Sequence, residues 1–446
     1  MSHSFWFDSA PVDHTAAIDR SALAGDVDVD VAVVGAGFTG LWTAQSLLAA
    51  DPTLRLVVLE RERVGFGASG RNGGWCVGDY GGPESAVAKV GGDRAVETMA
   101  REMIRAVDAT ESFVTEHAID CGFHRGGAIY TAVNDGQLKR LRHHHETLTR
   151  SGLGDAWQWL DAADARAILH GPAIRGAILT PHAAAVQPAA LALGIAAEVE
   201  RRGGRIHEAT TVEAIRPGGT RRAAVRTDHG TVTADWVVLA TEAYTHSVDG
   251  QQRRMLPLVN HVIATEPIDA SVWDRIGLRD RQLFELGAML LGYGQRTADD
   301  RIVWGGTSAG ARWNFGVPPS PSHSARIERR LVRRLTELLP ALEGVGVSHR
   351  WTGVLGVPRD LLPGIGVDRH QGFAWAGGYT GQGVAAANAA GRGLADLIRG
   401  VDTPLTRLPW VDHRSRPWEP EPRTWIGVHA AIAAAHTTDL VDRVRR

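Results

Sequence analysis

An α/β fold, with a Rossmann-type dinucleotide-binding domain and a discontinuous second domain built on a mixed sheet, is predicted from three features of the sequence. Residues 28–34 (DVDVAVV) are typical of a buried strand, a glycine-rich turn follows, and residues 38–49 have the pattern of a helix. The segment RLVVLE, which ends at Glu60, predicts the next parallel strand and completes a βαβ unit. At 446 residues, the chain also exceeds what one hydrophobic core usually organises, which indicates two domains.

Two later parts of the chain return to the pattern of the first domain. Pro188 opens a predicted helix, residues 235–241 (DWVVLAT) form another buried strand, and a helix is expected over 384–399. Between them, GGAIYTAV has the pattern of a hairpin, and residues 289–304 predict a strand-turn-strand that forms a pocket wall. The predicted nucleotide-binding domain comprises residues 28–84, 180–253 and 348–402, the second domain residues 85–179 and 254–347, and a tail with a helix residues 403–446.

Charge and cysteine usage exclude several classes of protein. A formal net charge of -2 with 22% charged residues lacks the basic surface that nucleic-acid binding requires, so a small molecule is the expected partner. Residues 1–30 contain no apolar run long enough for a signal peptide or a membrane anchor. Cys76 and Cys121 are too few for a disulfide framework. These features predict a cytoplasmic protein without membrane contact.

No metal site is predicted. His143, His144 and His145 are consecutive, and consecutive side chains on a helix point in different directions. No second cluster of ligands accompanies them in the sequence. We therefore interpret the three histidines as part of a solvated helix face.

The motif GAGFTG, at residues 35–40, lies directly between the predicted strand and the predicted helix. Gly35 permits the tight turn, Gly37 lets the backbone approach a pyrophosphate, and Gly40 allows close packing of the helix on the strand. The N-terminus of the helix offers free N–H groups to an anion. Glu60 can accept hydrogen bonds from ribose hydroxyls, and because an acidic partner disfavours a 2′-phosphate, NADP is not expected.

Two further glycine-rich loops suit a flat ligand. The loop GFGASGRNGGW, at residues 65–75, exposes backbone amides where the chain can press against such a ligand, which fits flavin better than nicotinamide. The loop GGYTGQGV, at residues 377–384, leads into a helix whose N-terminus can stabilise negative charge on the pyrimidine ring of reduced flavin. Together with Glu60, these loops predict FAD as the cofactor.

On these motifs the chain resembles the D-amino acid oxidase superfamily of FAD-dependent oxidoreductases, which includes glycine and sarcosine oxidases. Within it, the chain is similar to the gamma-glutamylputrescine oxidase-like branch, which shares the loop GASGRNGG. The resemblance covers nearly the whole chain, including Gln187-Pro188 and the segment RIVWGG at 301–306. It implies a Rossmann-type FAD-binding domain with a discontinuous, mixed-sheet substrate-binding domain. Relatives that tether flavin to cysteine use a segment without a match here, so FAD is expected to bind noncovalently.

The resemblance also implies which residues contact the cofactor. The loop at 65–75 is expected along the FAD, the backbone of Val212 at the adenine, and residues 381–384 at the flavin ring. The predicted cofactor-binding residues are Gly35, Gly37, Phe38, Thr39, Gly40, Glu60, Arg61, Ala68, Ser69, Arg71, Asn72, Gly73, Gly74, Val212, Ala240, Thr241, Gly378, Gly381, Gln382, Gly383 and Val384.

The chemistry that the resemblance implies is oxidation of the C–N bond of an amine. In this superfamily a hydride passes from the carbon beside the nitrogen to flavin N5, the imine hydrolyses, and reduced flavin is usually reoxidised by O2 with H2O2 formed. Sarcosine oxidases have a lysine above the flavin that assists the reaction with O2. Because neither Lys89 nor Lys139 lies in a matching segment, a dehydrogenase that uses another electron acceptor is an alternative.

Leu355 occupies the place where glycine oxidases hold the substrate carboxylate with an arginine, shortly after a Trp-x-Gly that is Trp351-Thr352-Gly353 in this chain. A carboxylate here lacks a bidentate partner, which favours an amine whose reacting carbon carries no carboxylate. A secondary or α-amino acid oxidase of the sarcosine or glycine type is the alternative.

An aromatic pocket suited to an ammonium or an apolar amine is predicted from Trp75, Tyr80, Tyr293 and Tyr379. Because His261 titrates near neutral pH, it is the candidate base. Trp75, Tyr293 and His261 are the predicted catalytic-site residues. Since fold does not dictate activity, a flavin-binding scaffold protein without turnover is the alternative from another class. The sequence does not indicate an oligomeric state.

Overall fold

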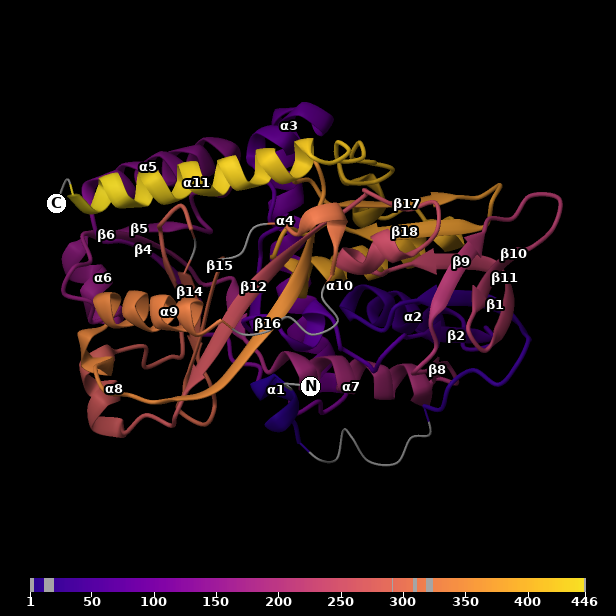
Figure 1. Ribbon diagram of the computed structural model, residues 1–446, viewed down its shortest axis with the longest axis horizontal. Helices are drawn as coiled ribbons and strands as arrows, with labels where there is room; N and C mark the ends of the chain where they lie inside the picture. The colour runs from indigo at the N-terminus through magenta and orange to yellow at the C-terminus, as the bar shows by residue number, and fades with distance from the viewer. Residues whose placement is uncertain (1–3, 12–19, 291, 308–310, 318–323, 445–446) are drawn as a thin grey trace.

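Most of the described strands form two large sheets, which occupy the two halves of the molecule in Figure 1, while β3 (Trp75–Val77) and β7 (Ala183–Ala185) form a separate two-stranded sheet. One sheet has a parallel centre, and the other is mixed. The predicted α/β class is therefore confirmed. The computed structural model describes residues 4–11, 20–290, 292–307, 311–317 and 324–444.

The first sheet is built around β1 (Val27–Val34), which pairs in parallel with β2 (Leu56–Leu59) on one side and β11 (Gly230–Leu239) on the other. Both faces of β1 are covered, so residues 31–34 are all buried and apolar. In the described chain, this sheet continues with β8 (Arg205–His207) beside β2, and with β18 (Phe373–Gly377), β17 (Gly364–Asp368), β10 (Ala223–Thr227) and β9 (Val212–Arg216) on the side of β11.

Helices α2 (Phe38–Ala50), α7 (Pro188–Arg201) and α10 (Gly383–Arg399) share a hydrophobic core with one face of this sheet. α10 approaches α2 closely because Gly391 carries no side chain: a Cβ at this position would lie 2.5 Å from Trp42 Cβ. A hydrogen bond of 2.9 Å between the hydroxyls of Tyr379 and Thr39 holds the start of α10 near the start of α2. Both ends belong to the predicted glycine loops.

The second sheet is mixed, with α8 (Ala270–Ile276) and α9 (Ala325–Leu338) on its outer face. In this sheet β16 (Val347–Val357) pairs with β12 (Leu256–Thr265) over most of its length. Residues 348–357, which the domain prediction assigned to the first domain, therefore extend the second sheet instead. The order in the described chain is β16 (Val347–Val357), β12 (Leu256–Thr265), β15 (Ile302–Thr307), β14 (Gly292–Arg296), β13 (Leu283–Leu286), β4 (Ala128–Ala132), β6 (Gly176–Thr180) and β5 (Gln158–Leu160).

The segment GGAIYTAV is not a hairpin, contrary to the prediction. It forms the single strand β4, which is antiparallel to β6 and parallel to β13. Its end leads directly into α5 (Asp135–Leu148), where Asn134 Oδ1 accepts a hydrogen bond from the backbone of Gln137 at 2.9 Å and caps the helix. The strand-turn-strand predicted over 289–304 is present as the antiparallel pair β14 and β15.

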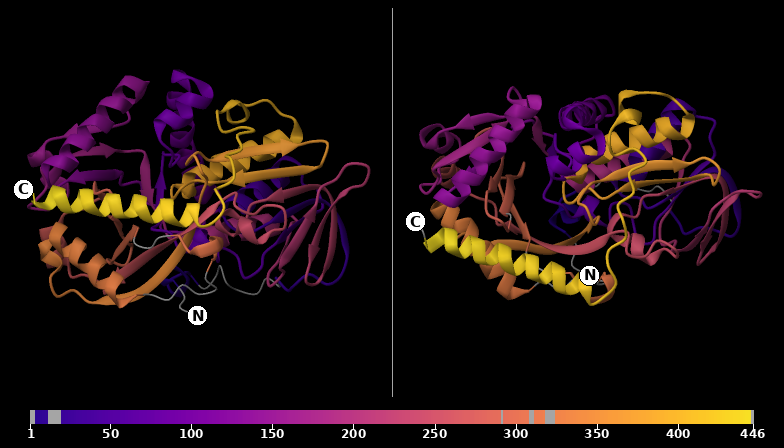
Figure 2. Two further views of the ribbon diagram at one scale, coloured as in Figure 1. Left: turned by 45° about the horizontal axis from the view of Figure 1, so that its top comes forward. Right: turned by 90° about the horizontal axis from the view of Figure 1, so that it is seen from above.

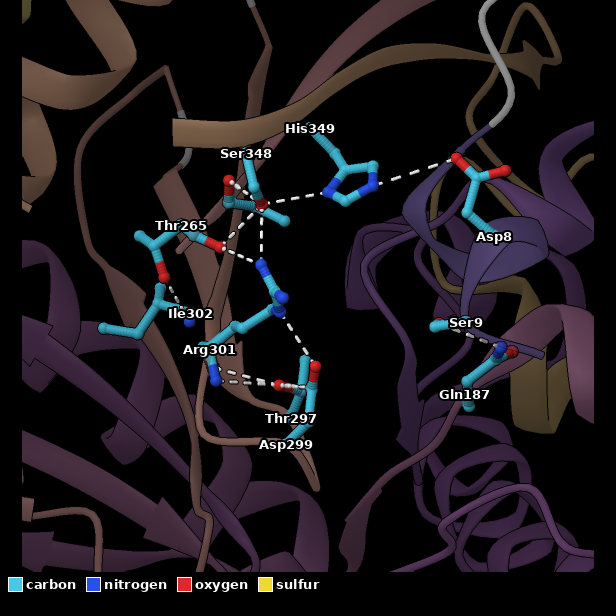
Figure 3. Close-up of polar contacts among 11 residues, drawn as sticks. Asp8, Ser9, Gln187, Thr265, Thr297, Asp299, Arg301, Ile302, Ser348 and His349 are labelled. Carbon is cyan, nitrogen blue, oxygen red and sulfur yellow. Dashed lines mark hydrogen bonds and ion pairs between the residues drawn. The ribbon is translucent and has the colours of Figure 1, made fainter. Parts of the chain in front are cut away.

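The short helix α1 (Phe5–Asp8) makes contacts with both halves of the molecule (Figure 3). On one side, Asp8 lies 3.8 Å from His349 on β16. On the other side, Gln187, which caps α7, donates a hydrogen bond to Ser9 at 3.4 Å. α1 therefore contacts both the strand that carries Leu355 and the first domain.

The long helix α11 (Arg423–Val444) runs along the second half of the molecule, as both views in Figure 2 show. Its Asp439 accepts hydrogen bonds from the backbone N–H groups of Met289 and Leu290, at 2.7 and 3.2 Å, and pairs with Arg334 on α9 at 3.2 Å. α11 thus holds the connection between β13 and β14. The other helices in the described ranges include α3 (Glu84–Gly91), α4 (Asp93–Glu116) and α6 (Ala162–Ile168).

Candidate active site

The GAGFTG turn has the geometry that the sequence predicts. Gly35 has a φ of +104°, and a Cβ there would lie 2.6 Å from the carbonyl oxygen of Ala240. A Cβ on Gly40 would lie far inside van der Waals contact of the Gly35 carbonyl oxygen, which confirms that Gly40 is needed for helix packing. Ser69 Oγ, from the second glycine loop, accepts a hydrogen bond from the backbone of Phe38 at 2.8 Å. The two loops therefore meet at the start of α2.

Glu60 lies at the end of β2, with its carboxylate turned back toward the glycine turn. One oxygen accepts a hydrogen bond from the backbone of Ala36 and the other from that of Glu62, both at 2.9 Å. Burial raises the pKa of this carboxyl, while the two backbone N–H groups oppose that change. Each oxygen keeps acceptor capacity for a further donor, such as a ribose hydroxyl.

The second glycine loop is braced from behind by side chains of distant segments. The backbone carbonyls of residues 70–72 accept hydrogen bonds from Ser4 Oγ, Trp351 Nε1 and Trp6 Nε1, in that order, at 2.7, 2.9 and 2.7 Å. Asn72 also accepts, through its side chain, a hydrogen bond from the backbone of Gly74 at 2.7 Å. With these carbonyls bound on one side, the loop has a fixed shape.

A cavity extends between the two halves of the molecule and connects the three glycine loops. At one end it is lined by Arg61 and Val212, and at the other by Trp75, Tyr293 and Leu355. Of the predicted cofactor residues, it is lined by Gly35, Gly37, Phe38, Thr39, Glu60, Arg61, Ala68, Ser69, Arg71, Asn72, Gly73, Val212, Ala240, Thr241, Gly381, Gln382, Gly383 and Val384.

Three predicted cofactor glycines do not line this cavity, for different reasons. Gly40 packs against the turn at Gly35, as described above. Gly74 has a φ of +71° and turns toward Gln295, whose side chain donates to the carbonyl of Gly73 at 2.7 Å. Gly378 donates its N–H to Glu242 at 2.9 Å. These glycines shape the backbone beside the cavity.

His261 does not lie at the cavity surface, as the register of β12 shows. The prediction that His261 is a catalytic base in the cavity is therefore wrong. Successive side chains of a strand point to opposite faces of its sheet. Asn260 and its partner Gly353 on β16 line the cavity, so His261 and its partner Thr352 face away from it. His261 is buried on that other side. From there its imidazole has no access to a ligand in the cavity.

The end of the cavity beyond Gly73 is aromatic. The Tyr293 ring lies against two glycines: a Cβ on Gly305 would lie 2.5 Å from its Cζ, and one on Gly73 would lie 2.9 Å from its Cδ2. The Tyr293 hydroxyl is held by the side-chain amide of Asn260. Trp75 stands nearly perpendicular to the Tyr293 ring, with 6.0 Å between the ring centroids. The two glycines and Asn260 thus fix the orientation of Tyr293.

Glu285 and Glu242 are cavity-lining acids that the sequence analysis missed. Burial and the nearby Asp79 raise the pKa of Glu285 to about 8. Burial raises the pKa of Glu242 to about 7. The Glu242 carboxylate lies between the Gly378 loop and Gly356 on β16, and so joins the two. Glu285 could have been identified from the sequence, because it is a single acid within the apolar strand LFEL. Asn260 interrupts the apolar strand LPLVNHVIAT in the same way.

The residues of the cavity fit FAD. The turn at Gly35 and Gly37 leaves no room for a side chain, and Glu60 provides acceptors at the level of a ribose. At the other end of the cavity, Gly381 has a φ of +107° and precedes the first turn of α10, whose N-terminus favours negative charge. No group of His, Cys, Asp or Glu suited to holding a metal ion is found among the described residues. Likewise, none of the described helices has the length and apolar character needed to cross a membrane.

Comparison with known proteins identifies the class. Residues 30–397 match the family model described as FAD dependent oxidoreductase, and the chain belongs to this family, as predicted. It is an FAD-dependent oxidoreductase.

Individual relatives agree with this assignment. The chain is 33% identical to gamma-glutamylputrescine oxidoreductase from Escherichia coli (strain K12) over 377 residues, which is 84% of each chain. It is 28% identical to the probable oxidoreductase OrdL from Haemophilus influenzae, covering 90% of this chain and 89% of that one. Its fold is similar to that of glycine oxidase from Geobacillus kaustophilus, with a TM-score of 0.74, 21% identity and coverage of 87% of this chain and 99% of that one.

Proposed function

We propose that this enzyme oxidises the C–N bond of an amine whose reacting carbon carries no carboxylate. When bound, FAD supplies the acceptor for a hydride, and the resulting imine hydrolyses to release a carbonyl product. The observation that carries the proposal is the lining of the cavity, which includes Leu355 and the aromatic side chains of Trp75, Tyr293 and Tyr379. The relative from Escherichia coli is named for an amine, gamma-glutamylputrescine, which agrees with this substrate class.

The cavity offers little to a carboxylate. Its cationic side chains among the described lining residues are Arg61 and Arg71. Arg71 donates to the backbone carbonyls of Phe66 and Thr352, at 2.8 and 3.3 Å, and Arg61 lies 3.3 Å from Glu62. A substrate carboxylate would therefore compete with existing partners. A bidentate arginine is the usual solution for such a group.

The residues of the chain orient the amine and exclude water. Trp75 and Tyr379 are both buried and both line the cavity. Tyr293 is fixed by Asn260 and by its two glycine neighbours. A rigid wall of this kind holds the bound substrate in one orientation and keeps water away from it.

The test is anaerobic reduction of the flavin by a panel of amines and amino acids. We expect alkylamines to bleach the visible flavin spectrum, and glycine and sarcosine to do so far more slowly. Faster turnover of glycine or sarcosine than of any amine would contradict the proposal and favour a secondary or α-amino acid oxidase. Absence of bleaching across the panel would favour a flavin-binding scaffold. Denaturation is expected to release all the FAD, since the proposal includes noncovalent binding.

Replacing Leu355 with arginine is expected to change the specificity. The new guanidinium faces the cavity, so the ratio of kcat/KM for glycine to that for an amine should rise at least about tenfold, the effect of one charge-assisted hydrogen bond. Steady-state kinetics with both substrates measure this ratio. Leu440→Arg, at a 62% exposed position on α11, is the matched control and should leave the ratio unchanged. An unchanged ratio in Leu355→Arg would show that this position does not face the substrate.

We propose O2 as the electron acceptor, with H2O2 formed. A specific observation favours a dehydrogenase as the second candidate: neither Lys89, on α3, nor Lys139, on α5, is among the lining residues of the cavity. Turnover with O2 should be compared with turnover with an artificial acceptor at equal amine concentration. A large preference for the artificial acceptor would favour the dehydrogenase.

A further inference from the structure

The far end of the cavity has three residues on adjacent strands that point to the same face of the second sheet. Glu285 on β13 pairs with Tyr130 on β4 and with Tyr293 on β14, and directly paired residues place their side chains side by side. Trp75 stands nearly perpendicular to both tyrosine rings, with centroid distances of 6.0 Å to each. A carboxyl therefore lies between two aromatic rings, and a third ring faces it from the first domain.

Glu285, Tyr130, Tyr293 and Trp75 form a box at this end of the cavity. The Tyr293 hydroxyl is bound by Asn260, but three other polar groups of the box have no partner inside the described chain. Within those residues, the Glu285 carboxyl takes part in no hydrogen bond or ion pair, and the charge that acts on it is a second acid, Asp79. In the same part of the chain, the Trp75 indole N–H and the Tyr130 hydroxyl have no hydrogen-bond partner. Trp75 is only 8% exposed, so water is largely excluded from it. Buried polar groups normally have partners, and here a ligand would supply them.

The missing partner is a cation. Within the described chain, the Glu285 carboxyl has no basic partner, which favours a positive ligand, and the faces of tyrosine and tryptophan rings attract a desolvated ammonium. A neutral hydroxyl or amide would satisfy hydrogen bonds but would leave an ionised Glu285 uncompensated. Among ligands of an amine-oxidising enzyme, an ammonium group has both the charge and the donors.

The same box is unsuited to the nitrogen that is oxidised. Hydride leaves the carbon beside a nitrogen only when that nitrogen has a free lone pair, so the reacting amine must be neutral. A carboxylate surrounded by aromatic rings stabilises the protonated amine instead. The nitrogen in the box is therefore one that stays charged during the reaction.

We propose that Glu285, together with Trp75, Tyr130 and Tyr293, binds a second, protonated nitrogen of the substrate, so that the preferred substrates are diamines. This inference rests on the proposed amine oxidation. Entry of the ammonium favours the ionised form of Glu285. Because the pKa of that carboxyl is raised to about 8 in the free enzyme, binding at neutral pH releases a proton.

The experiment is anaerobic calorimetric titration of the FAD-loaded enzyme, with its flavin already reduced by dithionite so that no amine can react, with diaminobutane and diaminohexane, against butylamine and hexylamine. We expect at least one diamine to bind about tenfold or more tightly than the monoamine of equal length. Its binding heat should also depend more steeply on the ionisation enthalpy of the buffer than that of the monoamine, because Glu285 releases a proton in addition to the one lost by the reacting amine. In Glu285→Gln both differences between diamine and monoamine should disappear.

Two further variants separate charge from structural effects. Glu285→Asp keeps the charge and should keep the preference for diamines, even if Glu285→Gln is less stable. Glu343→Gln, at an exposed position, is the matched control and should behave like the unmodified enzyme. Equal Kd values for diamine and monoamine in the unmodified enzyme, or a preference that survives in Glu285→Gln, would overturn the inference.

The outcome for the proposed function is read independently from flavin bleaching. If monoamines bleach the flavin and diamines have no advantage, amine oxidation stands and the second-nitrogen site is wrong. If no amine bleaches the flavin, the proposed function is wrong, whatever the titrations show.

Discussion

Protein in which Gly40 is replaced by alanine is expected to purify almost without FAD. The new Cβ would collide with the carbonyl oxygen of Gly35 and would lie 3.1 Å from Val33 Cγ1. Because the oxygen belongs to the backbone of the glycine turn, it cannot rotate away, and α2 must move from β1. Such overpacking usually costs about 1–3 kcal/mol or more. The displacement also disturbs Gly35 and Gly37, where the pyrophosphate is expected.

The ratio of flavin to protein absorbance in the purified protein measures this effect. We expect the ratio to fall strongly, with a lower Tm, and FAD titration to give a Kd at least about tenfold higher, since about 1.4 kcal/mol of binding free energy corresponds to a factor of ten. Gly427→Ala is the matched control, since a Cβ at this position on α11 has no heavy atom within 4 Å. Full FAD content in Gly40→Ala would contradict the role of Gly40 in packing.

Replacing Trp6 with alanine is expected to destabilise the protein and to weaken FAD binding together. Trp6 is 1% exposed, packs edge-on against Trp351, and donates a hydrogen bond to the backbone carbonyl of Asn72. Truncation of a buried tryptophan costs about 3–5 kcal/mol. The carbonyl of Asn72 also loses its partner, so the loop that is expected to contact FAD becomes less fixed. Denaturant unfolding and FAD titration measure the two effects.

A second substitution separates packing from the hydrogen bond. Trp6→Phe keeps most of the ring and removes the N–H donor, so we expect a loss of about 1 kcal/mol from the hydrogen bond and a smaller effect on FAD. Trp425→Ala, at a 38% exposed position on α11, controls for the loss of a tryptophan and should cost less than Trp6→Ala. If Trp6→Ala binds FAD as tightly as the unmodified chain, α1 does not support the flavin loop.

The parts of the site that are local in sequence could be predicted. The strand, turn and helix around Gly35 follow from apolar runs and glycine spacing, which depend on neighbours a few residues away. Glu60 follows from the end of the next strand. In each case the sequence contains all the interacting groups within one short segment, and the structure reproduces the prediction.

The substrate end could not be predicted in the same way, because it is assembled from strands distant in sequence. Whether Asn260 or His261 faces the cavity depends on which side of β12 the first domain packs. Glu285 gains its importance only through the neighbouring strands that carry Tyr130 and Tyr293. Likewise, the pairing of Trp6 with the carbonyl of Asn72 joins segments that no local pattern connects.

The pairing of β1 has a consequence for how the chain folds. Val27 lies beside Val232, so the first strand made by the ribosome must wait for a partner made much later. Contacts of such long sequence separation slow folding. The turn held by Asp439 is completed later still, when α11 has been synthesised. Chains interrupted before β11 is made expose an unpaired edge of β1, where aggregation is expected and chaperones would be needed.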